Sequence, residues 1–311
     1  MMDIVFCTDN NYVMPCGISM VSLFENNDGQ DITVHIIGMN LSKSSENILK
    51  GISDKYNSSV IFYNIDEEYI KKFELSMSGP KHVRISTYIR LFSAEILPQS
   101  LHKILYLDCD LIITDNLTQL WETDISDISV VGVIDAPNFR PDTYLRLNYD
   151  NRYPYINAGV LLINLKYWRE NNIQDKLLEY AKSNYPNIQC HDQDVINGAL
   201  HESIKLLPLR YNMHNFFYLE KWNAHEYQNE MIDSRATPAI VHFSTGNKPW
   251  VKGSFHPLTQ LYLKYKDISP WKSEPISWTG VSFNKRIKYY KRIILYALRL
   301  KRTKYVKAVN H

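Results

Sequence analysis

Two aspartates that follow an apolar stretch are the clearest chemical feature of this sequence. The segment Lys103-Ile-Leu-Tyr-Leu-Asp-Cys-Asp-Leu-Ile-Ile113 runs from a predicted buried strand into Asp108 and Asp110. Residues i and i+2 of a strand point to the same side, so the two carboxylates are expected to converge, at the strand end where open α/β sheets bind ligands. Carboxylates held this close repel each other unless a cation lies between them, and a divalent ion that also binds phosphate oxygens would suit. The alternative is a pair of turn aspartates that cap the next element.

A second apolar stretch delivers a histidine in the same way. The segment Ala239-Ile-Val-His-Phe-Ser-Thr-Gly-Asn-Lys-Pro-Trp250 places His242 at a predicted strand end, followed by Gly246 and Lys248. A histidine beside two aspartates favours Mn²⁺ over Mg²⁺, because imidazole suits softer ions. Gly246 would let a ligand approach the backbone, and Lys248 would neutralise a phosphate. Taken alone, His242 is more simply explained as a hydrogen-bonded residue that closes a strand.

The end of the first predicted strand carries a polar run, Thr8-Asp-Asn-Asn-Tyr12. In a doubly wound sheet a nucleotide commonly lies at the carboxyl end of the first strand, although a polar turn is an equally ordinary occupant of this position. The sequence has no Gly-x-Gly-x-x-Gly and no Walker loop, which argues against dinucleotide and ATP sites. A diphosphate would therefore have to be held by a metal ion.

Two further polar groups flank predicted elements in the second half of the chain. Asn157, Ala158 and Gly159 precede an apolar strand, and Asp192, Gln193 and Asp194 open a helix. Acidic residues at a helix start also serve as caps, so the second group has a purely structural explanation as well.

Strands and helices alternate along the first 240 residues, and this pattern positions the polar groups at strand ends. Alternation of this kind predicts an α/β domain with a mostly parallel central sheet. The predicted strands are Asp3–Thr8, Ile32–Ile37, Ser59–Asn64, Lys103–Leu107, Ser129–Asp135, Gly159–Asn164, Ile204–Leu207 and Ala239–Phe243. The predicted helices are Gly17–Asn26, Ser42–Tyr56 with Ser42 as N-cap, Ser86–Glu95, Gln174–Asn184 and Asp192–Ala199.

Composition limits the class of protein. The 311 residues are 45% hydrophobic and 22% charged, which are ordinary globular values and exclude disordered, collagen-like and disulfide-scaffold classes. The four cysteines form no Cys-x-x-Cys pair and are predicted to be reduced thiols. The chain starts without the charged and apolar regions of a signal peptide and contains no run of 18 apolar residues. We therefore expect a cytoplasmic protein.

The C-terminal segment differs from the rest in charge. From Asn284 to His311 there are ten basic residues and no acidic ones, which leaves 25 basic against 33 acidic residues elsewhere. Apolar residues recur at helical spacing on one stripe, and such a basic amphipathic helix is typical of peripheral binding to an anionic membrane. The alternative is a solvated helix packed on the body. A nucleic-acid partner fits the charge but no other feature. The stripe is Phe283, Ile287, Tyr290, Ile294 and Ala297 or Leu298.

Taken together, these groups resemble the family 8 retaining glycosyltransferases, and in particular bacterial lipooligosaccharide α-galactosyltransferases. The resemblance runs from Met2 to about Trp271 and is looser beyond it. It implies a GT-A fold with a single Rossmann-like nucleotide-sugar domain over residues 1–270, followed by a membrane-associating tail over residues 271–311. It also implies a UDP-hexose donor, with galactose favoured over glucose, and Mn²⁺.

The resemblance further implies roles for single residues. Asp108, Asp110 and His242 match the family's metal ligands. The family's uracil, ribose, donor-sugar and diphosphate contacts match Asp9, Asn11, Arg90, Asp108, Asn157, Ala158, Asp192, Gly246 and Lys248. Asp135 matches a residue near the transferred sugar, and Gln193 would face the reacting carbon. Thr8 and Cys109 are the only departures noted, and neither lies at a position that decides the assignment.

The chemistry that follows from the resemblance is transfer of the hexose with retention. We expect the acceptor hydroxyl to attack on the side of the leaving UDP, with Asp194 as an alternative nucleophile if its carboxylate can swing in. By position, the acceptor is expected to contact Ser76–His82 and Ser244–Val251. Lipopolysaccharide-type glycans are the favoured acceptors, at the inner face of a bacterial cytoplasmic membrane. A protein-linked or teichoic-acid-type acceptor, a nucleotide-sugar-binding protein without turnover, and a nucleotidyltransferase or hydrolase are the alternatives.

Overall fold

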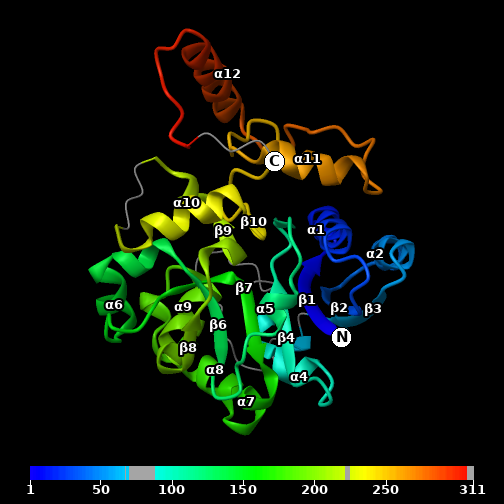
Figure 1. The fold of residues 1–311 in the computed structure, drawn as a ribbon, viewed down its shortest axis with the longest axis vertical. Helices are drawn as coiled ribbons and strands as arrows, with labels where there is room; N and C mark the ends of the chain where they lie inside the picture. Colours follow the sequence, from blue (N-terminus) through cyan, green and yellow to red (C-terminus); the bar gives the residue numbers. More distant parts are fainter. Residues whose placement is uncertain (67, 70–87, 221–224, 307–311) are drawn as a thin grey trace.

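A central sheet organises the chain in the computed structural model, which describes residues 1–66, 68–69, 88–220 and 225–306 (Figure 1). Its seven strands lie in the order β3-β2-β1-β4-β7-β6-β8. The strands are β1 (Met2–Asp9), β2 (Ile32–Met39), β3 (Ser59–Ile65), β4 (Lys103–Leu107), β6 (Val130–Ile134), β7 (Ile156–Asn164) and β8 (Ile204–Leu206). All seven were predicted from the sequence, with β7 starting earlier than expected because the Asn157 segment is already part of the strand.

The sheet is mixed but mostly parallel, as predicted. β1 pairs in parallel with β2 and with β4, and the β2/β3 and β6/β8 pairs are parallel too. Among the described strands of this sheet, β7 alone runs against its neighbours, β4 and β6. β1 and β4 therefore deliver their carboxyl ends to one edge of the sheet, and β7 begins at that edge.

Both faces of the sheet are covered, which explains why the strands are nearly continuous apolar runs. In β4, Leu105 and Leu107 join one hydrophobic core while Ile104 and Tyr106 join the other. The first core includes α1 (Val13–Glu25) and α2 (Lys43–Lys55), and the second includes α7 (Leu165–Glu170), α8 (Ile173–Ser183) and α9 (His191–Leu200). The other helices are α4 (Ser93–Ile96), α5 (Thr118–Trp121), α6 (Pro141–Leu147), α10 (Gln228–Ala236), α11 (Thr259–Asp267) and α12 (Phe283–Ala297).

A small second sheet lies beside the main one in the order β5-β10-β9. Its strands are β5 (Leu111–Ile113), β10 (Ile240–His242) and β9 (Met213–His214). The predicted strand Ala239–Phe243 thus exists, in shorter form, in this sheet rather than in the central one. Its antiparallel register with β5 pairs His242 with Leu111, next to Asp110.

Most predicted helices are present, with shifted ends. Ser42 caps α2 as predicted, and its hydroxyl accepts a hydrogen bond from the Ser45 amide. The segment predicted as a helix from Ser86 to Glu95 is different: its described part is a 3₁₀ turn over Ile89–Phe92 followed by the single turn of α4, and residues 86–87 lie outside the described residues. A turn this short is stabilised by burial of all four 3₁₀ residues rather than by helical hydrogen bonds.

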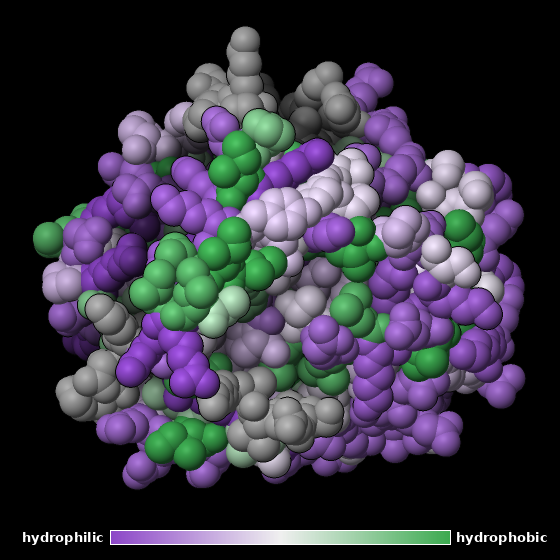
Figure 2. All heavy atoms as spheres, turned by 90° about the horizontal axis from the view of Figure 1, so that it is seen from above, coloured by the Kyte–Doolittle hydropathy of each residue, from purple (hydrophilic) through white to green (hydrophobic). Residues whose placement is uncertain are grey.

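The basic C-terminal segment forms the predicted helix, α12, which lies at the end of the molecule remote from most of the central sheet (Figure 1). Its apolar stripe faces outward: Phe283, Ile287, Ile294 and Leu298 are 73%, 50%, 57% and 62% exposed. Figure 2 views the molecule from this side and shows hydrophobic atoms gathered within a mostly polar face. Across the described residues, no helix has the length and apolar character to cross a bilayer.

Aromatic contacts on its other side hold α12 to the body. Tyr289 and Tyr296 lie against Phe255, with ring centroids 5.1 and 5.7 Å away. Beyond the helix the chain returns to the body, where Tyr305 is buried in the main core and the Val306 amide donates to the Tyr218 carbonyl. The boundary predicted at residue 270, between the catalytic domain and the tail, stays a prediction. Trp271 and Tyr305 both lie beyond this boundary and are part of the main hydrophobic core.

Candidate active site

The two aspartates and the histidine singled out in the sequence lie together. One ligand atom from each of Asp108, Asp110 and His242 can be chosen so that all three lie within 4.8 Å of one another. The His242 Nε2 atom is 3.1 Å from Asp110 Oδ1 and 3.7 Å from Asp108 Oδ2. Two carboxylates and an imidazole nitrogen converging in this way form a donor set that suits a divalent transition metal. These residues therefore fit the metal that the sequence predicts.

Two neighbours fix the histidine in this orientation. The His242 Nδ1 atom is 2.9 Å from Asn212 Oδ1, so Nδ1 carries the proton and Nε2 offers its lone pair to the cluster. Gly159 makes room for the ring: a Cβ at that position would lie 2.2 Å from His242 Cε1. The glycine of the Asn-Ala-Gly segment is thus required by the close approach of the His242 ring. Asn212 was missed in the sequence analysis, and no spacing or periodicity around it marks it.

Lys248 reaches back to the cluster from the loop after β10. Its ammonium group contacts Asp110 Oδ2 and donates to the Phe243 carbonyl at 2.7 Å. Burial would raise the pKa of the Asp110 carboxyl, but the nearby Lys248 and His242 outweigh burial and hold the pKa below its usual range. Asp110 is therefore ionised and able to bind a cation at neutral pH. The positive charge of Lys248 compensates the negative charge of the Asp110 carboxylate.

Arg90 is the centre of a second charged group. Its buried guanidinium lies 2.9 Å from Asp108 Oδ1 and 2.8 Å from Asp192 Oδ2, and donates to the Ala158 carbonyl at 2.6 Å. It also stacks over the Tyr106 ring, at 4.3 Å from the centroid. Burial raises the pKa of Asp192 to about 6, although Arg90 opposes the rise. Arg90 thus joins the metal-side Asp108 to Asp192, the residue expected to contact the sugar.

The remaining predicted sugar-side residues form one hydrogen-bonded network. Asp135 Oδ2 accepts from Asn157 Nδ2 and from Gln193 Nε2, both at 2.9 Å. The side-chain oxygen Oε1 of Gln193 accepts from the Ala158 backbone amide at 3.0 Å. Hydrogen bonds at both Oε1 and Nε2 therefore fix the orientation of the Gln193 side-chain amide. Asn157 Oδ1 in turn accepts from Asn212 Nδ2 at 2.8 Å, which connects the network to His242.

Asp194 lies at the far end of this network and is completely buried. Its carboxylate pairs with Arg146 at 2.6 Å and accepts from the Tyr155 hydroxyl at 2.7 Å. The backbone amides of Gln189 and Cys190 donate to it as well. A swing of Asp194 toward a bound sugar would break all four interactions. Arg146 and Tyr155 were not predicted, and both contact Asp194 across about 40 residues of sequence or more.

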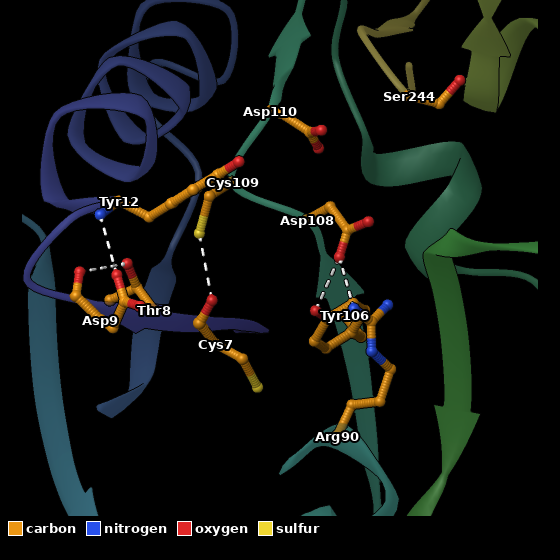
Figure 3. Close-up of a pocket in the computed structure, with 10 residues that line it drawn as sticks. All are labelled: Cys7, Thr8, Asp9, Tyr12, Arg90, Tyr106, Asp108, Cys109, Asp110 and Ser244. Atoms are coloured by element: carbon orange, nitrogen blue, oxygen red, sulfur yellow. Dashed lines mark hydrogen bonds and ion pairs between the residues drawn. The ribbon is translucent and has the colours of Figure 1, made fainter. Parts of the chain in front are cut away.

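The ends of β1 and β4 line a cavity of about 370 Å³ (Figure 3). Asp9 and Tyr12 lie on one side of it and Asp108 and Asp110 on the other. Asp9 Oδ1 accepts from the Tyr12 amide at 3.1 Å, which closes the turn after β1. The predicted nucleotide residue Asp9 and the predicted metal residues Asp108 and Asp110 therefore share one cavity, although they are about 100 residues apart in the sequence.

Two predicted donor contacts lie at the rim of this region. Asn11 is exposed, and its amide donates to Asp9 Oδ1 at 2.8 Å. Gly246 is also exposed, and a Cβ added there would meet no described atom within 4 Å. The predicted acceptor segment Ser76–His82 lies outside the described residues, whereas Ser244, in the other acceptor segment, lines the cavity.

Comparison with known proteins agrees with this geometry. The family model described as "Glycosyl transferase family 8" matches residues 3–253. The chain is 29% identical over 272 residues to a lipopolysaccharide 1,2-glucosyltransferase of Escherichia coli, covering 86% of this chain and 78% of that protein. It is 26% identical over 277 residues to general stress protein A of Bacillus subtilis, covering 87% and 94%.

Solved structures share the fold. A crystal structure of the galactosyltransferase LgtC in complex with donor and acceptor sugar analogues matches with a TM-score of 0.77 at 25% identity, covering 92% of this chain and 100% of that one. The glycosyltransferase GlyE of Streptococcus pneumoniae matches with a TM-score of 0.63 at 21% identity, covering 94% and 64%. The central sheet and its GT-A architecture are thereby confirmed. Because the family model spans most of the chain, including every residue that lines the cavity in Figure 3, this protein belongs to glycosyl transferase family 8.

Proposed function

We propose that this enzyme transfers a hexose from a UDP-sugar to a hydroxyl of a lipopolysaccharide-type glycan, with Mn²⁺ as cofactor and with retention at the anomeric carbon. The observation that carries the proposal is the cluster of Asp108, Asp110 and His242, whose two aspartates line a cavity together with Asp9 and Tyr12. The cluster and the polar turn lie at the two ends of a space suited to a nucleoside diphosphate. Relatives named as lipopolysaccharide glucosyl- and galactosyltransferases support the acceptor class.

The chain's own residues divide the work at the donor. Asp108, Asp110 and His242 would hold the metal, which when bound supplies positive charge against the diphosphate as UDP leaves. Lys248 would exchange its contact with Asp110 for a phosphate oxygen and stabilise the same developing charge. Asp9 and Asn11 would bind the uridine, and Arg90 and Asp192 would orient the sugar.

Attack on the side of the leaving group is the mechanism these contacts favour. The acceptor oxygen would form its bond to the anomeric carbon as the bond to the phosphate oxygen breaks, and the acceptor proton would pass to that phosphate oxygen. Gln193 would lie against the reacting carbon, and Asp135 would hold Gln193 in place. The ion pair with Arg146 holds Asp194 away from the nucleophile role. A glycosyl–Asp194 adduct detected by mass spectrometry would contradict this mechanism.

The outward apolar stripe of α12 supports a peripheral location at the inner face of the cytoplasmic membrane. Burying the side chains of Phe283, Ile287 and Ile294 in the interface would contribute about 1 kcal/mol or more each, which is enough for reversible binding. Packing of Tyr289 on Phe255 shows that the same helix also contacts the body, as the alternative expects. The two faces of the helix thus serve different contacts.

The deciding experiment measures UDP release from UDP-galactose and UDP-glucose, with and without Mn²⁺ and without acceptor. Mn²⁺-dependent release from one sugar identifies donor and metal together. Binding of UDP without any release, even with an acceptor panel, would contradict the enzyme and favour a nucleotide-sugar-binding protein. The panel includes protein-linked glycans and teichoic acid, because relatives from Bacillus subtilis and Streptococcus pneumoniae carry names that specify no acceptor.

A further inference from the structure

A second cavity, of about 660 Å³, lies between the loop after β10 and helix α12. Tyr12 lines both this cavity and the donor cavity. Lys248 also lines it, while its ammonium group contacts Asp110 of the metal cluster. The second cavity therefore adjoins the donor site, which is the cavity lined by Asp9, Asp108 and Asp110. A ligand in the second cavity would lie beside the loop that carries Lys248.

Cations dominate the lining. Besides Lys248, four basic side chains contribute: Lys252 from the loop, and Lys285, Lys288 and Arg292 from α12. None of the described residues that line the cavity is acidic. Within the described part of the chain, no carboxylate forms an ion pair with these four side chains. A concave surface that gathers charge of one sign attracts a ligand of the opposite sign.

The orientation of α12 makes this arrangement unusual. A surface helix ordinarily turns its apolar stripe to the body and its charges to solvent. In α12 the stripe that contains Ile287 and Ile294 faces outward, and the opposite side presents Lys288 and Arg292 to the cavity. Lys288 is exposed and Arg292 is half-buried over the Phe255 ring, and an anion between them would offset their mutual repulsion. The inverted orientation therefore points to an anionic ligand on the inner side of the helix.

The walls of the cavity are tightly built. The Lys252 amide donates to the Ser277 carbonyl at 2.9 Å, which fastens the loop to the segment before α12. Gly253 has a φ of +101°, and a Cβ there would lie 3.1 Å from the Trp278 ring and 3.3 Å from Tyr289. Only glycine combines this backbone with such a close approach. The Trp278 ring forms an aromatic wall, and the Lys252 ammonium group lies over it at 5.9 Å from the ring centroid.

We propose that this cavity binds a phosphate-bearing part of the glycan acceptor. Phosphate combines up to two negative charges with several acceptor oxygens, which matches a group of lysines and an arginine better than a single carboxylate does. The position beside Tyr12 and Lys248 favours the acceptor over a membrane phospholipid, because the face of α12 suited to lipid lies on the opposite side. The acceptor part of this assignment rests on the proposed function, whereas the anion site itself does not.

Inorganic phosphate is the probe for the test. It is titrated at constant ionic strength into the full-length protein with UDP present, while the indole N–H resonance of Trp278 is followed by NMR and assigned with Trp278→Phe. We expect a saturable shift in the unmodified chain. Lys288→Gln combined with Arg292→Gln is expected to weaken phosphate binding about tenfold, because two charge-assisted contacts are lost. Lys291→Gln with Lys301→Gln, which removes the same charge from exposed positions outside the lining, is expected to change it less than twofold.

Each other outcome overturns the assignment. The anion site is wrong if Trp278 shows no saturable shift, or if the cavity pair binds phosphate as well as the control pair. The acceptor assignment is wrong if the cavity pair, more than the control pair, loses sedimentation with phosphatidylglycerol vesicles, because the cations then serve lipid. UDP affinity measured by calorimetry separates these results from a failure of the proposed function. If the unmodified chain does not bind UDP, the proposed function is contradicted, whereas the result of the phosphate titration still stands.

Discussion

The protein holds its basic side chains in two different ways. In the donor site, Arg90 and Lys248 are largely buried and each contacts a carboxylate, as Arg146 does behind it. Along α12, Lys288 and Arg292 line a cavity whose described residues include no acid. Buried charges need partners because desolvation is costly, whereas cations at a wet cavity can wait for a ligand. In the donor site, the ion pairs fix the side-chain geometry before a ligand binds. In the α12 cavity, the positive charge remains to be neutralised by an anionic ligand.

This comparison predicts how substitutions will differ. Loss of one partner in the donor site leaves a buried charge uncompensated, which costs about 3–5 kcal/mol in general. Loss of a cation from the cavity of α12 should leave the fold intact and change only ligand binding. The Lys288/Arg292 pair described above tests the cavity side of this difference, and four further variants, from the largest expected effect to the smallest, probe the donor site, the outer face of α12 and the junction between them.

Asp110→Asn should have the largest effect. Its carboxylate faces both His242 and Lys248, and one carboxylate fewer leaves the diphosphate charge poorly neutralised. We expect kcat for Mn²⁺-dependent UDP release to fall at least about 10³-fold, in line with loss of a principal electrostatic contact. Asp127→Asn, at an exposed position, is the matched control. An Asp110→Asn enzyme that kept most of its kcat with Mn²⁺ would show that the metal assignment is wrong.

Gln193→Ala should act on the chemical step alone. The Gln193 side-chain amide contacts Ala158, Asp135 and Tyr155. Gln193 is not among the described residues that line the donor cavity. We expect kcat to fall about 10²-fold while UDP affinity measured by calorimetry stays within about twofold. Gln228→Ala, on the exposed start of α10, provides the control. A marked loss of UDP affinity would instead place Gln193 at the nucleotide.

How far the sequence alone predicts this molecule depends on whether the signal is local. Strands such as β4 are continuous apolar runs, and polar residues at their ends, such as Asp108 and Asp110, follow from the geometry of the sheet. The contact between Asn212 and His242 joins residues 30 positions apart, one in the 3₁₀ turn before β9 and the other in β10, and nothing local encodes it. Contacts of this kind depend on how strands cross, so they emerge only from the folded structure.

The tail shows the same limit in another form. Its periodicity predicts the α12 helix and its apolar stripe, and both are present. Periodicity cannot say which side of a helix meets the body. Here Tyr289 and Tyr296 contact Phe255, and the cations beside them turn inward. Three basic residues of α12, Lys285, Lys288 and Arg292, line the cavity, which periodicity alone does not predict.

Ile287→Ser combined with Ile294→Ser tests the outer face of the helix. Both side chains are at least half exposed, so the protein should fold normally, but each loses about 1 kcal/mol of interfacial burial. We expect partition onto phosphatidylglycerol vesicles to fall about tenfold in a sedimentation assay. Leu145→Ser with Ile232→Ser removes two apolar side chains of the body that are also more than half exposed, and should have little effect. Equal losses in both pairs would remove the membrane role of the stripe.

His256→Gln should have the smallest effect on activity, and its specific signature is the pH dependence of stability. His256 lies between the two regions, packed on Phe243, which follows His242 in the chain, and on Tyr305 from the tail. Burial, aided by nearby His242, lowers its pKa to about 3. In the unfolded chain a histidine binds a proton below about pH 6.5, so the unfolded state gains protons that the folded state refuses, and stability falls as pH drops from about 6.5 toward 3.

The substitution should therefore flatten part of the acid branch of the stability curve. Between pH 6.5 and 5.5 the unmodified chain should lose about 1 kcal/mol of unfolding free energy that His256→Gln retains, as measured by urea denaturation. His102→Gln, at an exposed histidine, is the control and should follow the unmodified chain. Parallel curves for His256→Gln and the unmodified protein would mean that the histidine is protonated in the folded state. The junction between the donor site and the tail would then carry a charge, and the contrast between paired and unpaired cations would extend into the core.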